Sequence, residues 1–467
     1  MKQLKLGLFE NVAANVGGTV TWRHEDDQRH RFDDLRYWRD LGEVLEDAGF
    51  DFLFLGDAWG WAEIDGVRPP VATQESLDLP RLDPVVVASA LLSTTRNLGL
   101  VVTGSVLVEP PYAFVRRMAT LDHLSGGRLG WNIVTTGTAE TAVRAFGMDM
   151  VAHDERYAMA EEFLEVAYAY WEGAWEPDAL TRDKRGRFAD PAKVHPVEHA
   201  GRFFRSQGYG NAPYSPQGTP VLFQAGASTA GRRLAGRHGE AVFIGSGPAA
   251  DLRRHASAVR AEAVAAGRAA SDVQVMAAVS CVVGASPGDA RRRHASVLRC
   301  QTPEATVASY AMFTGIDLSA HPPGTPMADL RTELSRTQLE RFAGRTVGDV
   351  LDAWRTHGVG AQPIVGTAQE VADEICALAE GADLDGVLLS PVLQPTSTLE
   401  FVEEVLPLLR ARGVLADGYR DGETLRERLT GSGSPVLPRT HPAAAHRHPR
   451  PGASPTRSGE HGGGRRG

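Results

Sequence analysis

The chain has 467 residues, 42% hydrophobic and 23% charged, with a net charge of −9 at pH 7. Such a chain can bury a large core, and its acidic balance argues against general binding to nucleic acid or to an acidic membrane surface. It has no apolar window long enough to span a membrane and no apolar signal region at its start, so we expect a cytoplasmic protein. The three cysteines, Cys281, Cys300 and Cys376, have no paired spacing, so we expect neither a disulfide framework nor a metal site.

Apolar, β-branched runs recur along the chain and predict eight strands. They cover residues 4–9, 51–56, 98–105, 129–135, 220–225, 241–245, 273–283 and 386–390. Continuous apolar runs of this kind are typical of a parallel sheet that is covered by helices.

Helical patterns follow most of these runs. We predict helices over 33–48, 84–95, 112–124, 154–171, 229–237, 249–266 and 399–412, with Asp154 as an N-cap. Successive βα units predict a (β/α)8 barrel over residues 1–430. An open doubly wound sheet is the alternative, but no GxGxxG follows the first run.

Two long segments interrupt the repeating pattern, and the tail has a different composition. The segments near 172–219 and 284–385 are read as insertions that could close over the barrel; the second holds helical patterns at 346–356 and 367–379. Residues 431–467 are rich in Gly, Pro, Arg and His and are predicted to be disordered.

In a barrel, the functional residues gather at the carboxyl ends of the strands. Those ends carry Asp57, Thr103, Asn132, Gln224 and Ser228 here, a set that is polar but mostly uncharged. The chain shows no HExxH metal motif, no GxSxG nucleophile elbow and no close pair of carboxylates at these ends. Such a site is better suited to hold a polar cofactor that carries the chemistry.

Small residues follow the fifth run, in QAGASTAG from Gln224 to Gly231. Gly226 and Ser228 could place backbone N–H groups and a hydroxyl at the start of a helix, where a phosphate binds readily. The alternative is that these residues only make a tight turn between strand and helix.

His153 and Tyr157 stand four residues apart at the start of a predicted helix and can share one face. They could line the same pocket. The alternative is that Tyr157 packs in the core and His153 lies exposed in a loop.

Several longer runs carry a resemblance to a known family. They are LDHLSGGRLGWNIVTT (121–136), HDERYAMAEEFLEV (153–166), WEGAWEPDAL (171–180), ADPAKVHPVEHAGRFF (189–204) and SPQGTPVLFQAGASTAGRRLA (215–235). In this order they resemble the FMN-dependent monooxygenases of the bacterial luciferase-like superfamily, in the branch that contains nitrilotriacetate monooxygenase component A and dibenzothiophene-sulfone monooxygenase. The resemblance covers almost all of residues 1–430.

The resemblance implies a barrel that uses reduced FMN and O2 and oxygenates a small organic substrate through a C4a-(hydro)peroxyflavin. It also implies a separate NAD(P)H:flavin reductase and a homodimer. The FMN-contacting positions of the family correspond to Asp57, Thr103, His153, Tyr157 and Ser228, and Asn132 is expected to face the flavin. We expect Ser228, Tyr157 and nearby amides to bind the phosphate, and Asp57, Thr103 and Asn132 to contact the ring and ribityl chain.

Two histidines could move protons in such a reaction: His24 after the first strand and His321 in the second insertion. Each could equally be a structural or exposed residue.

An F420-dependent hydride-transfer enzyme and a non-catalytic flavin-binding protein are the alternatives on the same barrel. Departures from the family pattern, at Glu25, Asp26, Ala145, Ala361 and Gln362, leave the substrate open.

Overall fold

The fold is a closed barrel of eight parallel strands. The computed structural model describes residues 2–64, 66–135, 139–226, 228–332, 339 and 342–448. The barrel strands are β1 (Lys5–Asn11), β2 (Phe52–Gly56), β3 (Gly99–Ser105), β4 (Leu129–Val134), β7 (Val221–Gln224), β8 (Ala241–Phe243), β9 (Gln274–Val283) and β11 (Gly386–Leu389). They pair in that order, and β11 closes the ring against β1. Each lies at one of the eight predicted runs, so the predicted barrel is confirmed.

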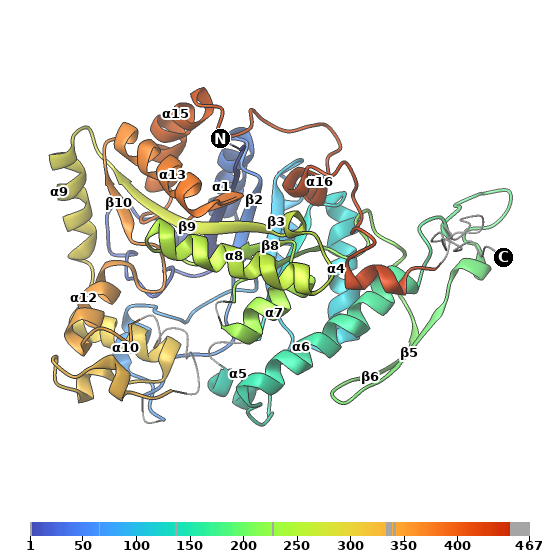
Figure 1. The fold of residues 1–467 in the computed structure, drawn as a ribbon, viewed down its shortest axis with the longest axis horizontal. Coiled ribbons are helices and arrows are strands. Elements are labelled where there is room, and N and C mark those ends of the chain that lie inside the picture. The colour runs from blue at the N-terminus through green and yellow to red at the C-terminus, as the bar shows by residue number, and fades with distance from the viewer. Residues whose placement is uncertain are drawn as a thin grey trace, which may run out of the picture.

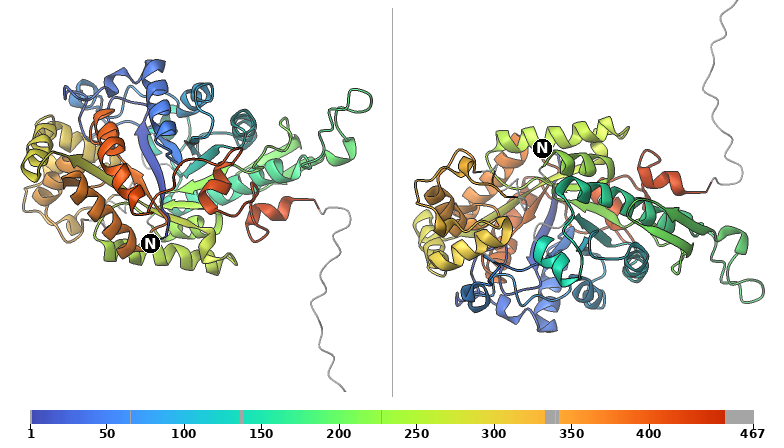
Figure 2. Two further views of the ribbon diagram at one scale, coloured as in Figure 1. Left: turned by 90° about the horizontal axis from the view of Figure 1, so that it is seen from above. Right: turned by 90° about the horizontal axis from the view of Figure 1, so that it is seen from below.

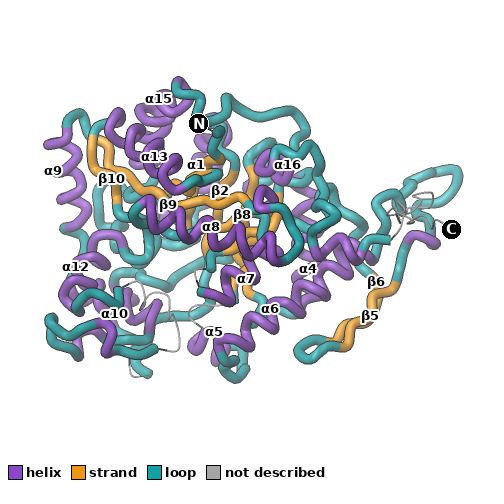
Figure 3. The backbone as a smooth tube through the Cα atoms, in the orientation of Figure 1, coloured by secondary structure: helices purple, strands orange, loops and turns teal. Residues whose placement is uncertain are grey.

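Helices surround the barrel, as Figures 1 and 3 show. They include α1 (Leu35–Asp47), α3 (Pro84–Leu91), α4 (Pro111–Ser125), α6 (His153–Tyr168), α7 (Thr229–His238), α8 (Ala249–Ala265), α13 (Ala368–Ala382) and α15 (Leu406–Ala411). In α1, the Asp34 carboxylate accepts from the Arg36 N–H at the first turn, and Trp38, Leu41 and Leu45 are buried against the barrel. Short helices α2 (Pro70–Gln74), α5 (Ala139–Ala145), α14 (Thr396–Glu400) and α16 (Leu425–Thr430) lie in the connecting segments.

Aromatic rings fill the barrel interior. Phe52 packs against Phe223 with centroids 5.2 Å apart, and Phe54 packs against Phe243 at 5.1 Å. These rings need small neighbours, because a Cβ at Gly7 would lie only 2.2 Å from the Phe52 ring. The interior is therefore a packed core, and ligands can enter only at its ends.

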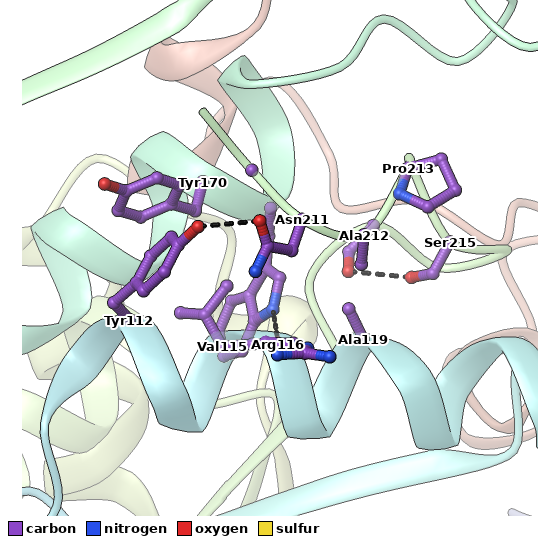
Figure 4. Close-up of a pocket in the computed structure, with 12 residues that line it drawn as sticks. Tyr112, Val115, Arg116, Ala119, Tyr170, Asn211, Ala212, Pro213 and Ser215 are labelled. Atoms are coloured by element: carbon purple, nitrogen blue, oxygen red, sulfur yellow. Dashed lines mark hydrogen bonds between the residues drawn. The ribbon is translucent and has the colours of Figure 1, made fainter. Parts of the chain in front are cut away.

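The first insertion contains β5 (Pro196–Ala200) and β6 (Arg205–Tyr209) and projects from the barrel as an arm (Figures 1 and 2). The two strands pair antiparallel. The base of the arm is tied to α4, because the Tyr112 hydroxyl donates to the Asn211 side-chain oxygen at 2.9 Å (Figure 4). The small pocket there, about 10 Å³, lies between α4 and the arm.

The second insertion forms a small unit of its own beside the barrel. It contains α9 (Pro287–Leu298), α10 (Pro303–Thr314), α12 (Val347–His357) and β10 (Pro363–Gly366). Tyr310, Val347 and Trp354 belong to an apolar cluster separate from the main core. Strand β10 pairs with the outer half of β9, from Ser280 onward, so β9 joins the barrel to this unit.

The tail differs from the prediction, because residues 431–448 pack on the barrel. His441 is 1% exposed and its Nε2 donates to the His238 carbonyl at 2.9 Å. Arg447 Nε lies 2.5 Å from Glu172 Oε2, and Leu437 and Ala443 are buried. The boundary predicted at 431 is too early, because hydrogen bonds and ion pairs hold this segment where apolar residues are few. Residues 449–467 lie outside the described residues. Among the described helices, none is both long and apolar enough to cross a membrane.

Candidate functional site

Polar side chains gather where β2, β3, β4 and β7 end at one mouth of the barrel. Thr103 and Asn132 are direct cross-strand partners, and Gln224 is the partner of Ile133, the residue after Asn132. The structure therefore brings together residues that are far apart in the sequence. This is the end of a barrel at which enzymes place their chemistry.

The Thr103–Asn132–Gln224 group contains buried polar atoms that lack a hydrogen-bond partner among the described residues. The Asn132 amide donates to the Thr103 hydroxyl at 3.1 Å, and all three residues are 5% exposed. The amide oxygens of Asn132 and Gln224 are buried and have no hydrogen-bond partner among the described residues. Because an unmade bond to a buried polar atom costs about 1–3 kcal/mol, these oxygens indicate donors supplied by a ligand.

Asp57 follows β2 and lies at the same mouth. Its carboxylate accepts from the Ala58 N–H at 2.8 Å, and its Oδ1 is 4.0 Å from Arg81 Nη1. Burial raises the pKa of Asp57 to about 6, against the opposing effect of the Arg81 charge. Burial likewise lowers the pKa of Arg81. The sequence analysis singled out Asp57 but missed Arg81, which has no signal in the sequence beyond its place in the segment DLPRLDP (78–84).

A second group forms where β7 meets α7. Ser228 is the N-cap of α7, and its hydroxyl accepts from the Gly231 N–H at 3.0 Å. The Tyr157 hydroxyl lies 3.2 Å from Ser228 Oγ, so the two predicted phosphate ligands meet. At Gly226 a Cβ would approach the Gln224 amide to 2.5 Å and Gly231 Cα to 2.9 Å, which excludes larger residues. Two hydroxyls beside a helix N-terminus form a favourable anion site.

Helix α6 carries Tyr157 into this group. It begins at His153, whose side chain lies outside the described residues, and the residue before it, Ala152, has no capping side chain. Asp154 is therefore not the N-cap that the sequence predicted. It lies in the first turn, where a carboxylate still interacts favourably with the helix dipole.

The two histidines proposed as acids or bases lie outside these groups. His24 Nε2 is 2.9 Å from Ser296 Oγ on α9, and His24 Nδ1 accepts from the Asp26 N–H. His24 lines a small pocket with residues of α9 and α14, and none of the predicted flavin residues lines that pocket. His321 follows a short turn, Leu318–Ala320, in the second insertion.

A large cleft lies beside the mouth, between the ends of β8 and β9 and the second insertion. Its volume is about 1270 Å³, and its lining includes Ser246, Ser280, Arg345 and Gln362. Ala361 also lines it, so two of the positions that depart from the family pattern face this cleft. A space of this size, with polar groups from several elements, is suited to an organic substrate.

The fold is an α/β barrel with polar groups gathered at the carboxyl ends of its strands, where barrel enzymes place their active sites. The family model for luciferase-like monooxygenases matches residues 15–384. The chain therefore belongs to the luciferase-like monooxygenase family. The resemblance stated from the sequence motifs is confirmed, and with it the prediction that the protein is a monooxygenase.

Individual relatives cover nearly the whole chain. The crystal structure of a riboflavin lyase, described with modified FMN and substrate riboflavin, has a TM-score of 0.94 at 61% identity, covering 96% of this chain and 100% of that chain. Dimethyl-sulfide monooxygenase of Hyphomicrobium sulfonivorans is 35% identical over 456 residues, 96% of this chain and 94% of the relative. Nitrilotriacetate monooxygenase component A of Aminobacter aminovorans is 32% identical, covering 92% of this chain and 96% of the relative.

Proposed function

We propose that this protein is an FMN-dependent monooxygenase whose organic substrate is itself a flavin, riboflavin or a close analogue. The observation that carries this proposal is the 61% identity, over 96% of the chain, to the riboflavin lyase whose structure is described with modified FMN and riboflavin. The other two relatives are less similar, at 35% and 32% identity, and their names refer to different substrates.

The residues at the mouth fit FMN. Ser228 and Tyr157 bind the phosphate together with the first amides of α7, where Gly226 allows close approach. The buried oxygens of Asn132 and Gln224 accept hydrogen bonds from the ribityl hydroxyls, with Thr103 beside them. Asp57 contacts the ring, and His153 completes the set that the family pattern assigns. When bound, reduced FMN supplies the electrons that activate O2.

The protein's own part is to bind, orient and exclude water. The substrate flavin enters the cleft of about 1270 Å³ beside the mouth, where Ser246 and Ser280 at the strand ends and Gln362 on the second insertion offer hydrogen bonds. Single ligand pockets are commonly about 300–1,000 Å³, so the cleft has room for a second ring system next to FMN. One oxygen atom of O2 enters the substrate and the other leaves as water, with two electrons taken from reduced FMN.

A separate reductase supplies reduced FMN in this proposal. The relative called component A supports a two-component arrangement by its name. We also expect a homodimer, which light scattering would test. No acid–base role is assigned to His24 or His321, because neither joins the groups at the mouth. The family match favours oxygenation over F420-dependent hydride transfer.

The test uses purified full-length protein, riboflavin, FMN, NADH, a flavin reductase and oxygen. We expect riboflavin to be consumed only when all components are present, and one oxygen atom from 18O2 to appear in the oxygenated product. Dimethyl sulfide and nitrilotriacetate serve as competing substrates. Oxidation of one of these with riboflavin left intact would refute the flavin substrate. Replacing the reductase with photoreduced FMN shows whether the reductase only delivers the cofactor.

A further inference from the structure

Arg81 is a nearly buried cation whose side chain makes no hydrogen bond to any described residue. Its side chain is 10% exposed, and its Nε is buried without a partner. A guanidinium stays protonated, so leaving its Nε–H buried and unpaired is costly. Such a residue persists where a ligand completes its bonding.

The acidic neighbours of Arg81 do not complete its bonding. Asp57 is 4.0 Å away, beyond hydrogen-bond distance. Asp78 is 2.6 Å from Arg68 Nη2 and is already paired. Asp83 accepts from the Val85 N–H as the N-cap of α3. The guanidinium therefore has one loosely placed counter-charge and free donors.

Arg29 shows what a structural arginine at the same end of the barrel looks like. It is 1% exposed, and its guanidinium contacts Glu10 at 3.0 Å, Asp27 at 2.7 Å and the Pro391 carbonyl at 2.8 Å. Each of the three guanidinium nitrogens donates to a protein oxygen. Arg81 has none of this network, so its role differs from that of Arg29.

The strand order places Arg81 at one end of the bound cofactor. The neighbouring strands run β7, β4, β3, β2 around the barrel. The phosphate group binds at Ser228 after β7, and Asn132 and Thr103 follow on β4 and β3. The isoalloxazine ring then reaches β2, where Asp57 and Arg81 lie. This placement rests on the proposed function.

The geometry points to Arg81 as the residue that binds the N1–C2=O edge of reduced FMN and selects the reduced, anionic cofactor over the oxidised one. Reduction by two electrons with uptake of one proton leaves a negative charge on the ring. This charge is shared by N1 and the carbonyl oxygen on C2. A fixed guanidinium beside that edge attracts the anion more strongly than the neutral oxidised ring. An enzyme that receives its cofactor already reduced gains from this preference.

The test compares Arg81→Met with Arg39→Met, which removes an exposed arginine of α1 as a matched control. Anaerobic fluorescence titration measures the Kd for reduced FMN and, separately, for oxidised FMN. We expect Arg81→Met to weaken binding of reduced FMN roughly tenfold to a hundredfold, with less than about a threefold change for oxidised FMN. Arg81→Lys should keep part of the preference for reduced FMN, because lysine keeps the positive charge but lacks the planar guanidinium with its paired N–H donors.

A second readout is the absorbance of bound reduced FMN as the pH is lowered. The wild-type protein should hold the anionic form to lower pH than Arg81→Met does. Equal weakening of both redox forms, or no weakening, would overturn the inference. Failure of the wild-type protein to bind reduced FMN would instead overturn the proposed function, so the two failures are distinguishable.

Discussion

Arg81 and Arg426 lie at opposite ends of the same barrel and differ in how their side chains are hydrogen-bonded. Arg426 is 1% exposed and bonds to Glu240 at 2.6 Å, to the Thr219 carbonyl at 2.8 Å and to the Pro435 carbonyl at 2.6 Å. It joins α16, the starts of β7 and β8, and the C-terminal segment. Arg81, at the carboxyl ends, has no hydrogen bond to the described residues.

The difference teaches where stability and function lie in this fold. At the amino ends, Arg426 is fully paired with protein groups and holds the chain together. At the carboxyl ends, Arg29 is paired in the same way, but the amide oxygens of Asn132 and Gln224 have no hydrogen-bond partner among the described residues, so these two oxygens can accept from a ligand. Variants at the two ends should therefore separate loss of folding from loss of binding.

The largest effect is expected at the amino ends. Arg426→Met leaves Glu240 buried without its charge partner and should lower the free energy of unfolding by about 3–5 kcal/mol. Arg81→Met, its counterpart at the mouth, should change it by less than about 1 kcal/mol, because no hydrogen bond is lost. Urea unfolding followed by fluorescence measures both. Similar losses for the two variants would remove the contrast between the ends.

The next effect concerns the phosphate group. Ser228→Ala combined with Tyr157→Phe should raise the Kd for reduced FMN about tenfold or more, because bonds to a charged phosphate are lost. Riboflavin has no phosphate, so its binding to the cleft should change little. Fluorescence titration with each flavin measures this, and Ser246→Ala in the cleft is the converse control. Equal effects on both flavins would mean that the two sites are not distinguished by phosphate.

A smaller effect is expected from the charge of Asp57. Its pKa is about 6 because burial disfavours the carboxylate, with Arg81 opposing and Asp83 adding to the shift. An anionic ring beside it raises that pKa further, so binding takes up a proton. Affinity for reduced FMN should therefore be highest below pH 6 and fall as the pH rises through 6, by up to about tenfold per unit.

Asp57→Asn tests the direction of this pH dependence, because the substitution removes the titrating carboxyl group and keeps a hydrogen-bond acceptor. The variant should bind reduced FMN more tightly than wild type at pH 8 and equally at pH 5. The titrations of FMN itself are common to both proteins and cancel in the comparison. Parallel pH profiles would show that Asp57 does not face the ring.

The smallest effect concerns residues 431–448, which pack near the amino ends of the barrel strands. Burial holds the pKa of His441 well below its usual value, and its Nδ1 accepts from the Ala443 N–H, which protonation would forbid. The depressed pKa means that stability is complete above about pH 6.5 and is lost as the pH falls below it, by about 1 kcal/mol per unit. Hydrogen exchange of residues 431–448 between pH 7.5 and 5 should show this. His441→Asn should exchange faster at neutral pH and lose most of the pH dependence.

Much of the fold could be predicted from local sequence, because each strand is a continuous apolar run and most helices carry their own caps and apolar face. The boundaries that were wrong depended on distant partners. Residues 431–448 look too polar to fold, yet His441 and Arg447 find His238 and Glu172 about 200 and 275 residues away. Asp154 lies two residues too late to cap α6.

By itself, the sequence determined the barrel, the family and most of the polar residues that gather at the mouth, since strand ends and motifs can be recognised without knowing their neighbours. Only the tertiary structure decided which of these residues meet: Thr103 with Asn132, and Tyr157 with Ser228, but neither His24 nor His321 with either pair. It also decided that Arg81 Nε is buried without a hydrogen-bond partner among the described residues. The physical reason is that burial and bonding are set by contacts between distant segments, and an arginine's place in the sequence says nothing about how many of its donors are met.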